Sequence, residues 1–198
     1  NVCDLVFNVK RELNFAQIQK LTNFAKEKKL NISYRVKDFI TPVLLAQKNQ
    51  IFYPDFKIDL NSDIFIQATK NGLESIIKII RKFIISCKAE LKAVDLYAGF
   101  GAYSFAISDL VKKVTAFEGS QEMVDLINKN AAANGLSKKI KAQNLDLFSV
   151  PLSKNELQEF DLAIINPPRN GASPQVLEIS KSTIKNLIYV SCSPESFR

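Results

Sequence analysis

The chain has 198 residues, of which 46% are apolar and 24% are charged. This composition, with no apolar run long enough for a membrane span and no signal-peptide pattern, predicts a globular cytoplasmic protein without a membrane partner. Histidine is absent, which excludes Ser-His and Cys-His catalysis and most zinc enzymes. The formal net charge of +7 fits a nucleic-acid partner. The same charge is explained equally well without a nucleic-acid partner, because the lysines are scattered and the composition is also rich in Asn and Ile.

Three cysteines, Cys3, Cys87 and Cys192, lie far apart in the sequence. This odd and sparse set predicts no disulfide framework, and no CxxC pair marks a zinc site. We therefore expect no bound metal from the cysteine spacing. A cysteine such as Cys3 is most simply a buried thiol.

Residues 1–65 are predicted to form a small α+β module. Apolar residues recur at helical spacing over 14–29. Short runs rich in β-forming residues follow and are broken by Asp, Pro and Asn, which predicts strands paired in hairpins. These runs are NISYRV (31–36), TPVLLAQ (41–47), QIFY (50–53) and FKIDL (56–60).

Residues 66–198 alternate between strand and helix patterns. The predicted strands are LKAVDLY (91–97), VTAFE (114–118), KIKAQNLD (139–146), FDLAIIN (160–166) and NLIYVSC (186–192). The predicted helices cover 71–88, 120–135 and 173–182, and a loop runs into a further helix over 99–110. This alternation predicts an α/β fold with a parallel, doubly wound sheet, whose ligand sites form at the carboxyl ends of the strands.

Polar or reactive residues end the predicted strands, namely Asp95 to Tyr97, Glu118, Asp146, Asn166 and Cys192. Gly99 and Gly101 follow the first strand and allow the backbone to turn tightly and to approach a ligand closely. Ser104 replaces the third glycine of the dinucleotide fingerprint, and Glu118 stands where a carboxylate can accept both ribose hydroxyls. Together these features favour an adenosine cofactor without a pyrophosphate, so S-adenosylmethionine fits better than NAD.

The sequence NPPRNG follows the fourth predicted strand. Two prolines make a rigid loop that presents Asn166 and Arg169, although an ordinary strand-to-helix turn has the same pattern. Methyltransferases that act on base amino groups carry an aromatic residue after the two prolines. Arg169 stands there instead, which argues against that chemistry.

Five motifs in order resemble the RNA uracil-C5 methyltransferase family. They are FIQAT (65–69), DLYAGFGAYSF (95–105), AFEGSQEMVDLINKNAAANGL (116–136), NPPRNGASPQ (166–175) and YVSCSPESF (189–197). The resemblance implies a Rossmann-like class I methyltransferase domain over 66–198, incomplete at its carboxyl end. It also implies S-adenosylmethionine as cofactor, and a uridine in a single-stranded or loop region of rRNA or tRNA as the methyl acceptor.

The resemblance further implies a role for individual residues. Gln67 would contact the methionine part of the cofactor, Tyr97 would line the cofactor pocket and Glu118 would hold the ribose. Asn166 stands at a position of the cofactor site that is usually Asp, and Cys192 would be the nucleophile. In this chemistry a thiolate adds to C6 of uracil, C5 takes the methyl group, and a base removes the C5 proton. No imidazole is required, and the positive charge of Arg169 would favour the thiolate.

The chain also departs from the family pattern. Ala98 and Ala102 stand where many relatives have Cys and Asn, so no cofactor contact is assigned to Ala102. The family's general-base glutamate is not found after 189–197, and the chain begins at Asn1 without an initiator methionine, so we expect a chain truncated at both ends. Cys3 falls where some relatives place the fourth ligand of a [4Fe-4S] cluster. We expect a monomer. A non-catalytic S-adenosylmethionine- or RNA-binding remnant is one alternative. An RNA 5-methylcytosine methyltransferase is another, but it would carry a second cysteine in the proline loop.

Overall fold

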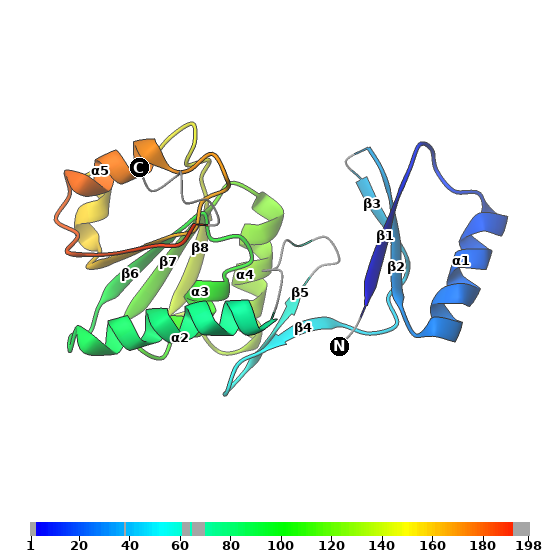
Figure 1. The fold of residues 1–198 in the computed structure, drawn as a ribbon, viewed down its shortest axis with the longest axis horizontal. Coiled ribbons are helices and arrows are strands. Elements are labelled where there is room, and N and C mark those ends of the chain that lie inside the picture. The colour runs from blue at the N-terminus through cyan, green and yellow to red at the C-terminus, as the bar shows by residue number, and fades with distance from the viewer. Residues whose placement is uncertain (1–2, 38, 61–63, 65–69, 192–198) are drawn as a thin grey trace. The chain divides into compact units, whose positions relative to one another are not determined.

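The computed structural model describes residues 3–37, 39–60, 64 and 70–191. The chain divides into two compact units, Asn1–Phe65 and Ile66–Arg198 (Figure 1). Among the described residues, no helix is both long and apolar enough to cross a membrane.

The first unit contains a three-stranded sheet, one helix and a separate hairpin. Its elements are β1 (Asp4–Val9), α1 (Phe15–Lys28), β2 (Asn31–Val36), β3 (Phe39–Leu44), β4 (Asn49–Phe52) and β5 (Lys57–Leu60). The sheet has the order β1-β2-β3, and β4 pairs with β5 alone. Helix α1 packs against β2 and β3. It begins at a capping box, in which the Asn14 side chain accepts the Gln17 amide and the Gln17 side chain accepts the Asn14 amide, each at 3.0 Å.

One strand of this unit, β1, was not predicted. It pairs in parallel with β2, so the unit is not built from hairpins alone. Helix α1 lies between these strands in the chain and supplies the crossover that parallel neighbours require. The β2–β3 and β4–β5 pairs are antiparallel, as expected.

The second unit alternates helices and strands. Its elements are α2 (Lys70–Ser86), β6 (Lys92–Leu96), α3 (Ala102–Ile107), β7 (Lys113–Glu118), α4 (Gln121–Ala133), β8 (Ile140–Asn144), the 3-10 helix η1 (Glu156–Glu159), β9 (Leu162–Ile165), α5 (Ser173–Ser180) and β10 (Asn186–Tyr189). The five strands are all parallel, in the order β10-β9-β6-β7-β8, which confirms the predicted doubly wound sheet. Figure 1 shows α5 on one side of this sheet and α2 on the other.

The centre of the sheet forms the core of the second unit. Strand β9 is buried throughout and β6 is buried from Ala93 onward, as expected for strands covered on both faces. Strand β6 lies between β7 and β9, so the strand order reverses at β6. Ligands of open α/β sheets bind outside the carboxyl ends of the strands at such a reversal. A ligand site is therefore expected at the carboxyl ends of β6, β7 and β9.

Several element ends differ from the prediction. Strand β8 ends at Asn144 and β10 at Tyr189, each before the predicted position, and η1 was not predicted. The helix predicted within 99–110 is confined to Ala102–Ile107. One backbone bond to the neighbouring strand follows each early end, from the Leu145 amide to Glu118 of β7 and from the Val190 amide to Ile165 of β9. Beyond β8, the Asp146 side chain then bonds within its own turn.

Candidate active site

In the loop between β6 and α3, residues with positive φ alternate with residues whose φ is not positive. Tyr97, Gly99 and Gly101 have φ values of 59°, 55° and 82°. A Cβ atom on Gly101 would also lie 3.0 Å from Cγ1 of Ile127, so this position requires glycine for space as well as for φ. Three amides of this loop are bonded within the protein: Ala98 donates to the Phe117 carbonyl at 3.1 Å, Gly99 to the Glu118 carboxylate at 2.8 Å and Gly101 to the Ala98 carbonyl at 2.8 Å.

A buried carboxylate holds the end of this loop. Asp95 is fully buried in β6, and its Oδ2 accepts the Ser104 amide at 3.0 Å and the Ser104 hydroxyl at 2.6 Å. Gly101 has no side chain with which to cap α3, so Asp95 supplies the acceptor that an N-cap residue normally provides. Its Oδ1 has no hydrogen-bond partner among the described residues. Burial raises the pKa of Asp95 to about 6, against the lowering effect of Ser104.

Ser104 was noted in the sequence only as a departure from the glycine fingerprint. Its bonds to Asp95 explain why a serine fits there, since it supplies both a backbone and a side-chain donor to one buried oxygen. The pair was not predicted because nine residues and a loop separate the two side chains. An acid near the end of a buried strand, followed by a Ser in the first turn of the next helix, is the signal that could have identified it.

Glu118 ends β7 beside the same loop. Its Oε2 accepts the Gly99 amide at 2.8 Å and its Oε1 accepts the Ser120 amide at 3.0 Å. The half-buried carboxylate thus connects the β6–α3 loop to the β7–α4 connection. A carboxylate offers about four acceptor positions. Two bonds therefore leave Glu118 with capacity to accept hydroxyl groups of a ligand.

Tyr97 forms an aromatic wall with residues that sequence reasoning did not select. Its ring lies 5.1 Å from that of Phe148, and its hydroxyl donates to the Leu147 carbonyl at 3.5 Å. Burial, then the charges of Tyr189 and Asp146, raise the pKa of Tyr97 to about 12. The loop after β8 and the end of β10 therefore both lie near Tyr97. Phe148 lies just beyond β8 and Tyr189 ends β10, so the strand-end rule could have found both.

Asp146 shapes the loop that carries Phe148. Its carboxylate accepts the Phe148 amide at 3.0 Å and the Ser149 hydroxyl at 2.6 Å. The hydrogen bond from the Ser149 side chain is the main reason that the pKa of Asp146 is lowered. This strand-end acid therefore stabilises a turn in the described structure.

Asn166 follows β9, next to the end of β6. Its amide donates to the Leu96 carbonyl at 3.3 Å. Its half-buried side chain makes no hydrogen bond within the described part of the chain, so its amide group remains available to a ligand. In the loop that follows, the Gly171 amide donates to the Pro168 carbonyl at 2.9 Å, and Arg169 is exposed.

The fold brings three of the predicted site residues to one edge. Tyr97, Glu118 and Asn166 follow or end the adjacent strands β6, β7 and β9 at their carboxyl ends. Gln67 and Cys192 lie outside the described residues. The last described residue is Ser191, and the Val190 amide donates to the Ile165 carbonyl of β9 at 2.8 Å.

The other cysteines differ from each other in exposure. Cys3 is exposed, so the expectation of a buried thiol there was wrong. The Cys87 thiol, which is half-buried, donates to the Phe83 carbonyl at 3.4 Å. Within the described ranges, no group of three His, Cys, Asp or Glu side chains could hold a metal ion.

The tRNA (uracil-5-)-methyltransferase family model matches residues 6–198. The chain belongs to this family. It is 34% identical over 175 residues to an uncharacterized RNA methyltransferase of Caldanaerobacter subterraneus, which covers 85% of this chain and 35% of the relative. It is 30% identical over 195 residues to a 23S rRNA (uracil(1939)-C(5))-methyltransferase of Shewanella sediminis, covering 96% and 43%. The chain therefore spans less than half of the length of each relative.

Solved structures confirm the fold of a class I methyltransferase. The tRNA (uracil-54, C5)-methyltransferase of Pyrococcus abyssi, solved with S-adenosyl-L-homocysteine, has a TM-score of 0.75 at 19% identity and covers 98% of this chain and 47% of its own. TYW2 of P. horikoshii, solved with MeSAdo, has a TM-score of 0.60 at 17% identity and covers 98% and 71%. The family resemblance of the sequence motifs is thus confirmed, whereas the role of each site residue remains a prediction.

Proposed function

We propose that this chain is part of an enzyme that transfers a methyl group from S-adenosylmethionine to C5 of a uridine in rRNA or tRNA. Family membership over residues 6–198 gives the reaction class. The assignment of the cofactor site rests on one structural observation. The glycine loop after β6 is bonded to Glu118, and this carboxylate retains acceptor capacity where β6 and β7 end.

The described residues fit an adenosine cofactor. Glu118 would accept the ribose hydroxyls, Tyr97 would line the pocket, and the free amide group of Asn166 would bind polar atoms nearby. Gln67 is assigned to the methionine part by the family motif alone. When bound, S-adenosylmethionine supplies an electrophilic methyl group to uracil C5.

Cys192 is proposed to make that carbon nucleophilic. Its thiolate forms a bond to C6, and the electron pair of the C5–C6 double bond moves toward the C4 carbonyl to give an enolate. C5 of this enolate then forms its bond to the methyl carbon as the bond from that carbon to the sulfonium sulfur breaks, with S-adenosylhomocysteine as the leaving group. A base takes the C5 proton, the double bond re-forms and the thiolate leaves. The sulfur of Cys192 is therefore regenerated in each cycle, and no imidazole takes part.

A fluorinated RNA tests the covalent step. Transcripts of tRNA and 23S rRNA made with 5-fluorouridine carry fluorine at C5, which a base cannot remove as a proton. After methyl transfer the adduct should persist, so a protein–RNA band should survive denaturing electrophoresis and require S-adenosylmethionine.

Two cysteine variants identify the nucleophile. Cys192→Ala should abolish the covalent band, whereas Cys87→Ala should leave it unchanged. A band that persists in Cys192→Ala, or one mapped by mass spectrometry to Cys3 or Cys87, would overturn the assignment. If the wild-type chain forms no band with either transcript, the covalent mechanism is wrong for this chain.

A further inference from the structure

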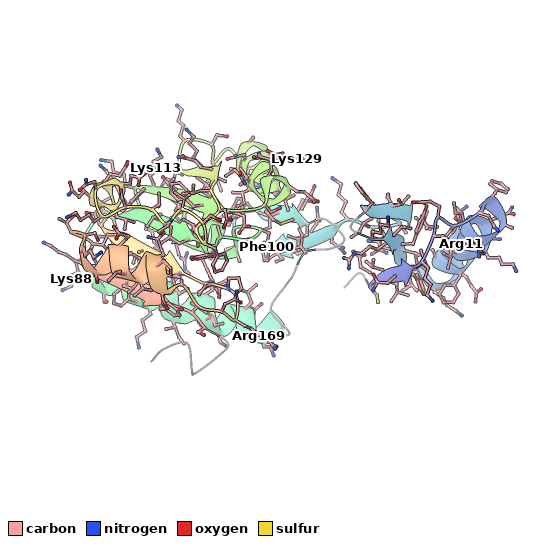
Figure 2. The ribbon with its side chains drawn as sticks, turned by 90° about the horizontal axis from the view of Figure 1, so that it is seen from above. Arg11, Lys88, Phe100, Lys113, Lys129 and Arg169 are labelled. Carbon is pink, nitrogen blue, oxygen red and sulfur yellow. The ribbon has the colours of Figure 1, made fainter. Side chains whose placement is uncertain are left out.

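The sheet of the second unit has a second edge, where β6, β7 and β8 begin. Because all three strands are parallel, the connections that precede them meet at this edge, opposite the carboxyl ends. These connections and the first strand positions carry six lysines, here called the amino-edge lysines. They are Lys88, Lys92, Lys112, Lys113, Lys138 and Lys139. In Figure 2, Lys88 and Lys113 lie on the left of the second unit, and Phe100 and Arg169 lie to their right.

Backbone pairing places these lysines next to one another. Lys92 is directly opposite Lys113 in the β6–β7 register, and both side chains are exposed. The Lys112 amide donates to the Leu91 carbonyl at 2.8 Å, which joins the connections before β7 and β6. Like charges directly opposite each other on paired strands repel. A neutral polar side chain at either strand position would remove this repulsion, so the arrangement is not required by the fold.

The acids at this edge do not neutralise the cluster. Asp109 is held by both terminal nitrogens of Arg81, at 2.6 and 2.8 Å. The carboxylate of Asp161 accepts the backbone amide of Lys92 at 2.8 Å. Glu90 lines a hollow of about 400 Å³ together with Lys88. Six cations thus face three carboxylates, one of which already has an arginine partner.

The ammonium groups themselves are mostly free to bind an external anion. Lys139 also lines the hollow and donates to the Ser108 and Val111 carbonyls at 3.1 and 3.3 Å, so it stabilises the connection before β7. For the other five amino-edge lysines, no ammonium group has an ion pair or hydrogen bond within the described ranges. Five unpaired ammonium groups along one edge make a surface that suits a polyanion.

We propose that the amino-edge lysines form a second RNA-contacting surface, which binds phosphates of the RNA outside the nucleotide that is methylated. The proposal rests on the proposed function, because it takes RNA as the partner. Strands of five residues span about 17 Å, so this edge cannot touch the same nucleotide as the carboxyl edge. Its contribution is sequence-independent affinity from phosphate contacts. A protein partner fits less well, since protein interfaces are depleted in lysine and are built around apolar anchors.

Two matched triple variants test the proposal. The first replaces Lys88, Lys92 and Lys113 with Gln, and Lys139 is kept because of its bonds to the backbone. The control replaces Lys78, Lys129 and Lys154 with Gln; these exposed residues lie on α2, on α4 and before η1. Both variants lose the same charge, so long-range electrostatic effects are matched. Filter binding would measure the affinity for a tRNA and a 23S rRNA transcript over a series of salt concentrations.

The two triple variants should differ in the salt dependence of RNA binding and in RNA affinity. If the three amino-edge lysines each contact a phosphate, the slope of log K against log salt should become shallower by about 2, since each contact contributes about 0.7 on single-stranded RNA. Affinity at low salt should fall at least about 10-fold in this variant, against less than about 3-fold in the control. S-adenosylmethionine affinity, measured by calorimetry, should be unchanged in both.

Other outcomes would overturn the proposal. Equal losses in the two variants would show that the edge makes no local contact, although wild-type RNA binding would still support the proposed function. No salt-dependent RNA binding by the wild-type chain would overturn both. The same variants should be assayed on phosphatidylserine vesicles and on an acidic protein. A loss there, with RNA binding intact, would assign the surface to a membrane or to a protein partner instead.

Discussion

The two edges of the parallel sheet hold their polar side chains in different ways. At the carboxyl edge, Asp95 accepts two hydrogen bonds from Ser104 of α3, and Glu118 accepts two from backbone amides of the loops beside it. At the amino edge, Lys92 and Lys113 stand opposite each other with no acid bonded to either ammonium group in the described structure. Hydrogen bonds hold the carboxylate oxygens of the carboxyl edge in place. The ammonium groups of Lys92 and Lys113 are concentrated in one region, but no bond within the described part of the chain holds them in place.

This difference suggests different kinds of ligand for the two edges. A carboxylate held by two backbone amides presents its remaining acceptor positions in a constant direction, which suits a small molecule of defined shape. Unpaired lysines have long flexible stems and act as mobile point charges, which suits a phosphate backbone whose position varies. Under the two proposals, the same fold would combine shape recognition at one end of its strands with charge recognition at the other.

The largest predicted effect concerns the buried carboxyl of Asp95, whose pKa is raised from 3.8 to about 6. A carboxyl with a raised folded pKa contributes stability that is fully present below the unfolded pKa and is lost as pH rises through the folded pKa. Between about pH 4 and pH 7, wild type should therefore lose about 3 kcal/mol relative to Asp95→Asn. Urea unfolding at several pH values would measure the difference.

An exposed acid with the opposite shift provides the control. The hydrogen bond from Arg81 lowers the pKa of Asp109, so that carboxyl contributes stability above its unfolded pKa and loses it as pH falls. The difference between wild type and Asp109→Asn should thus change in the opposite direction with pH. If the unfolding free energies of wild type and Asp95→Asn change in parallel with pH, the pKa of Asp95 is not raised by burial, and the contrast between the two edges of the sheet would be weaker.

A smaller effect is expected for cofactor binding at Glu118. Removing its carboxylate should weaken S-adenosylmethionine binding by about 1–3 kcal/mol, because buried ribose hydroxyls would lose their acceptor. Calorimetry should compare Glu118→Ala with Glu159→Ala, an exposed acid of η1. Since Glu118 also bonds the Gly99 amide, loss of loop order has to be separated from loss of the hydroxyl contact.

An analogue without ribose hydroxyls separates the two effects. If Glu118 accepts those hydroxyls, wild type should bind the 2′,3′-dideoxy form of S-adenosylhomocysteine weakly, and Glu118→Ala should weaken it little further. If the variant loses the same affinity for the analogue as for the natural compound, Glu118 acts only through the loop.

The smallest effect is expected at the amino edge. Lys92→Gln should raise the free energy of unfolding by a few tenths of a kcal/mol, about 0.2–0.5, because it removes the repulsion from Lys113. Added salt should erase the gain by screening the charges. Lys78→Gln, on α2, should leave the stability unchanged. A destabilised Lys92→Gln protein would mean that this side chain supports the fold, contrary to the difference between the edges.

The sequence was most informative where apolar residues form continuous runs. It predicted all five strands of the parallel sheet, because burial on both faces leaves a run such as the LAII of β9. It was least informative at element ends and in the first unit. Strand β1 carries a similar run, but nothing in it shows that its neighbour is reached through α1 and pairs in parallel.

The candidate site was predicted in part for the same reason. The strand-end rule places Tyr97, Glu118 and Asn166 at one edge once the strands are known, and the structure has them there. The rule does not say what each side chain bonds to. Asp146 bonds within its own turn, and Phe148, which was not selected, lies against Tyr97. These pairings depend on distances between loops that are far apart in the chain.

The sequence alone thus determined the alternation of strands and helices, the parallel sheet and the edge that carries the candidate site, because hydrophobic periodicity and strand-end polarity are local properties. The tertiary structure alone decided the long-range partners. Asp95 is close to Ser104 because the glycine loop leads directly from β6 into α3, and Lys92 faces Lys113 because β6 and β7 pair in that register. Register and packing are set by the whole core, so neither the raised pKa of Asp95 nor the lysine pair at the amino edge could be read from the residues themselves.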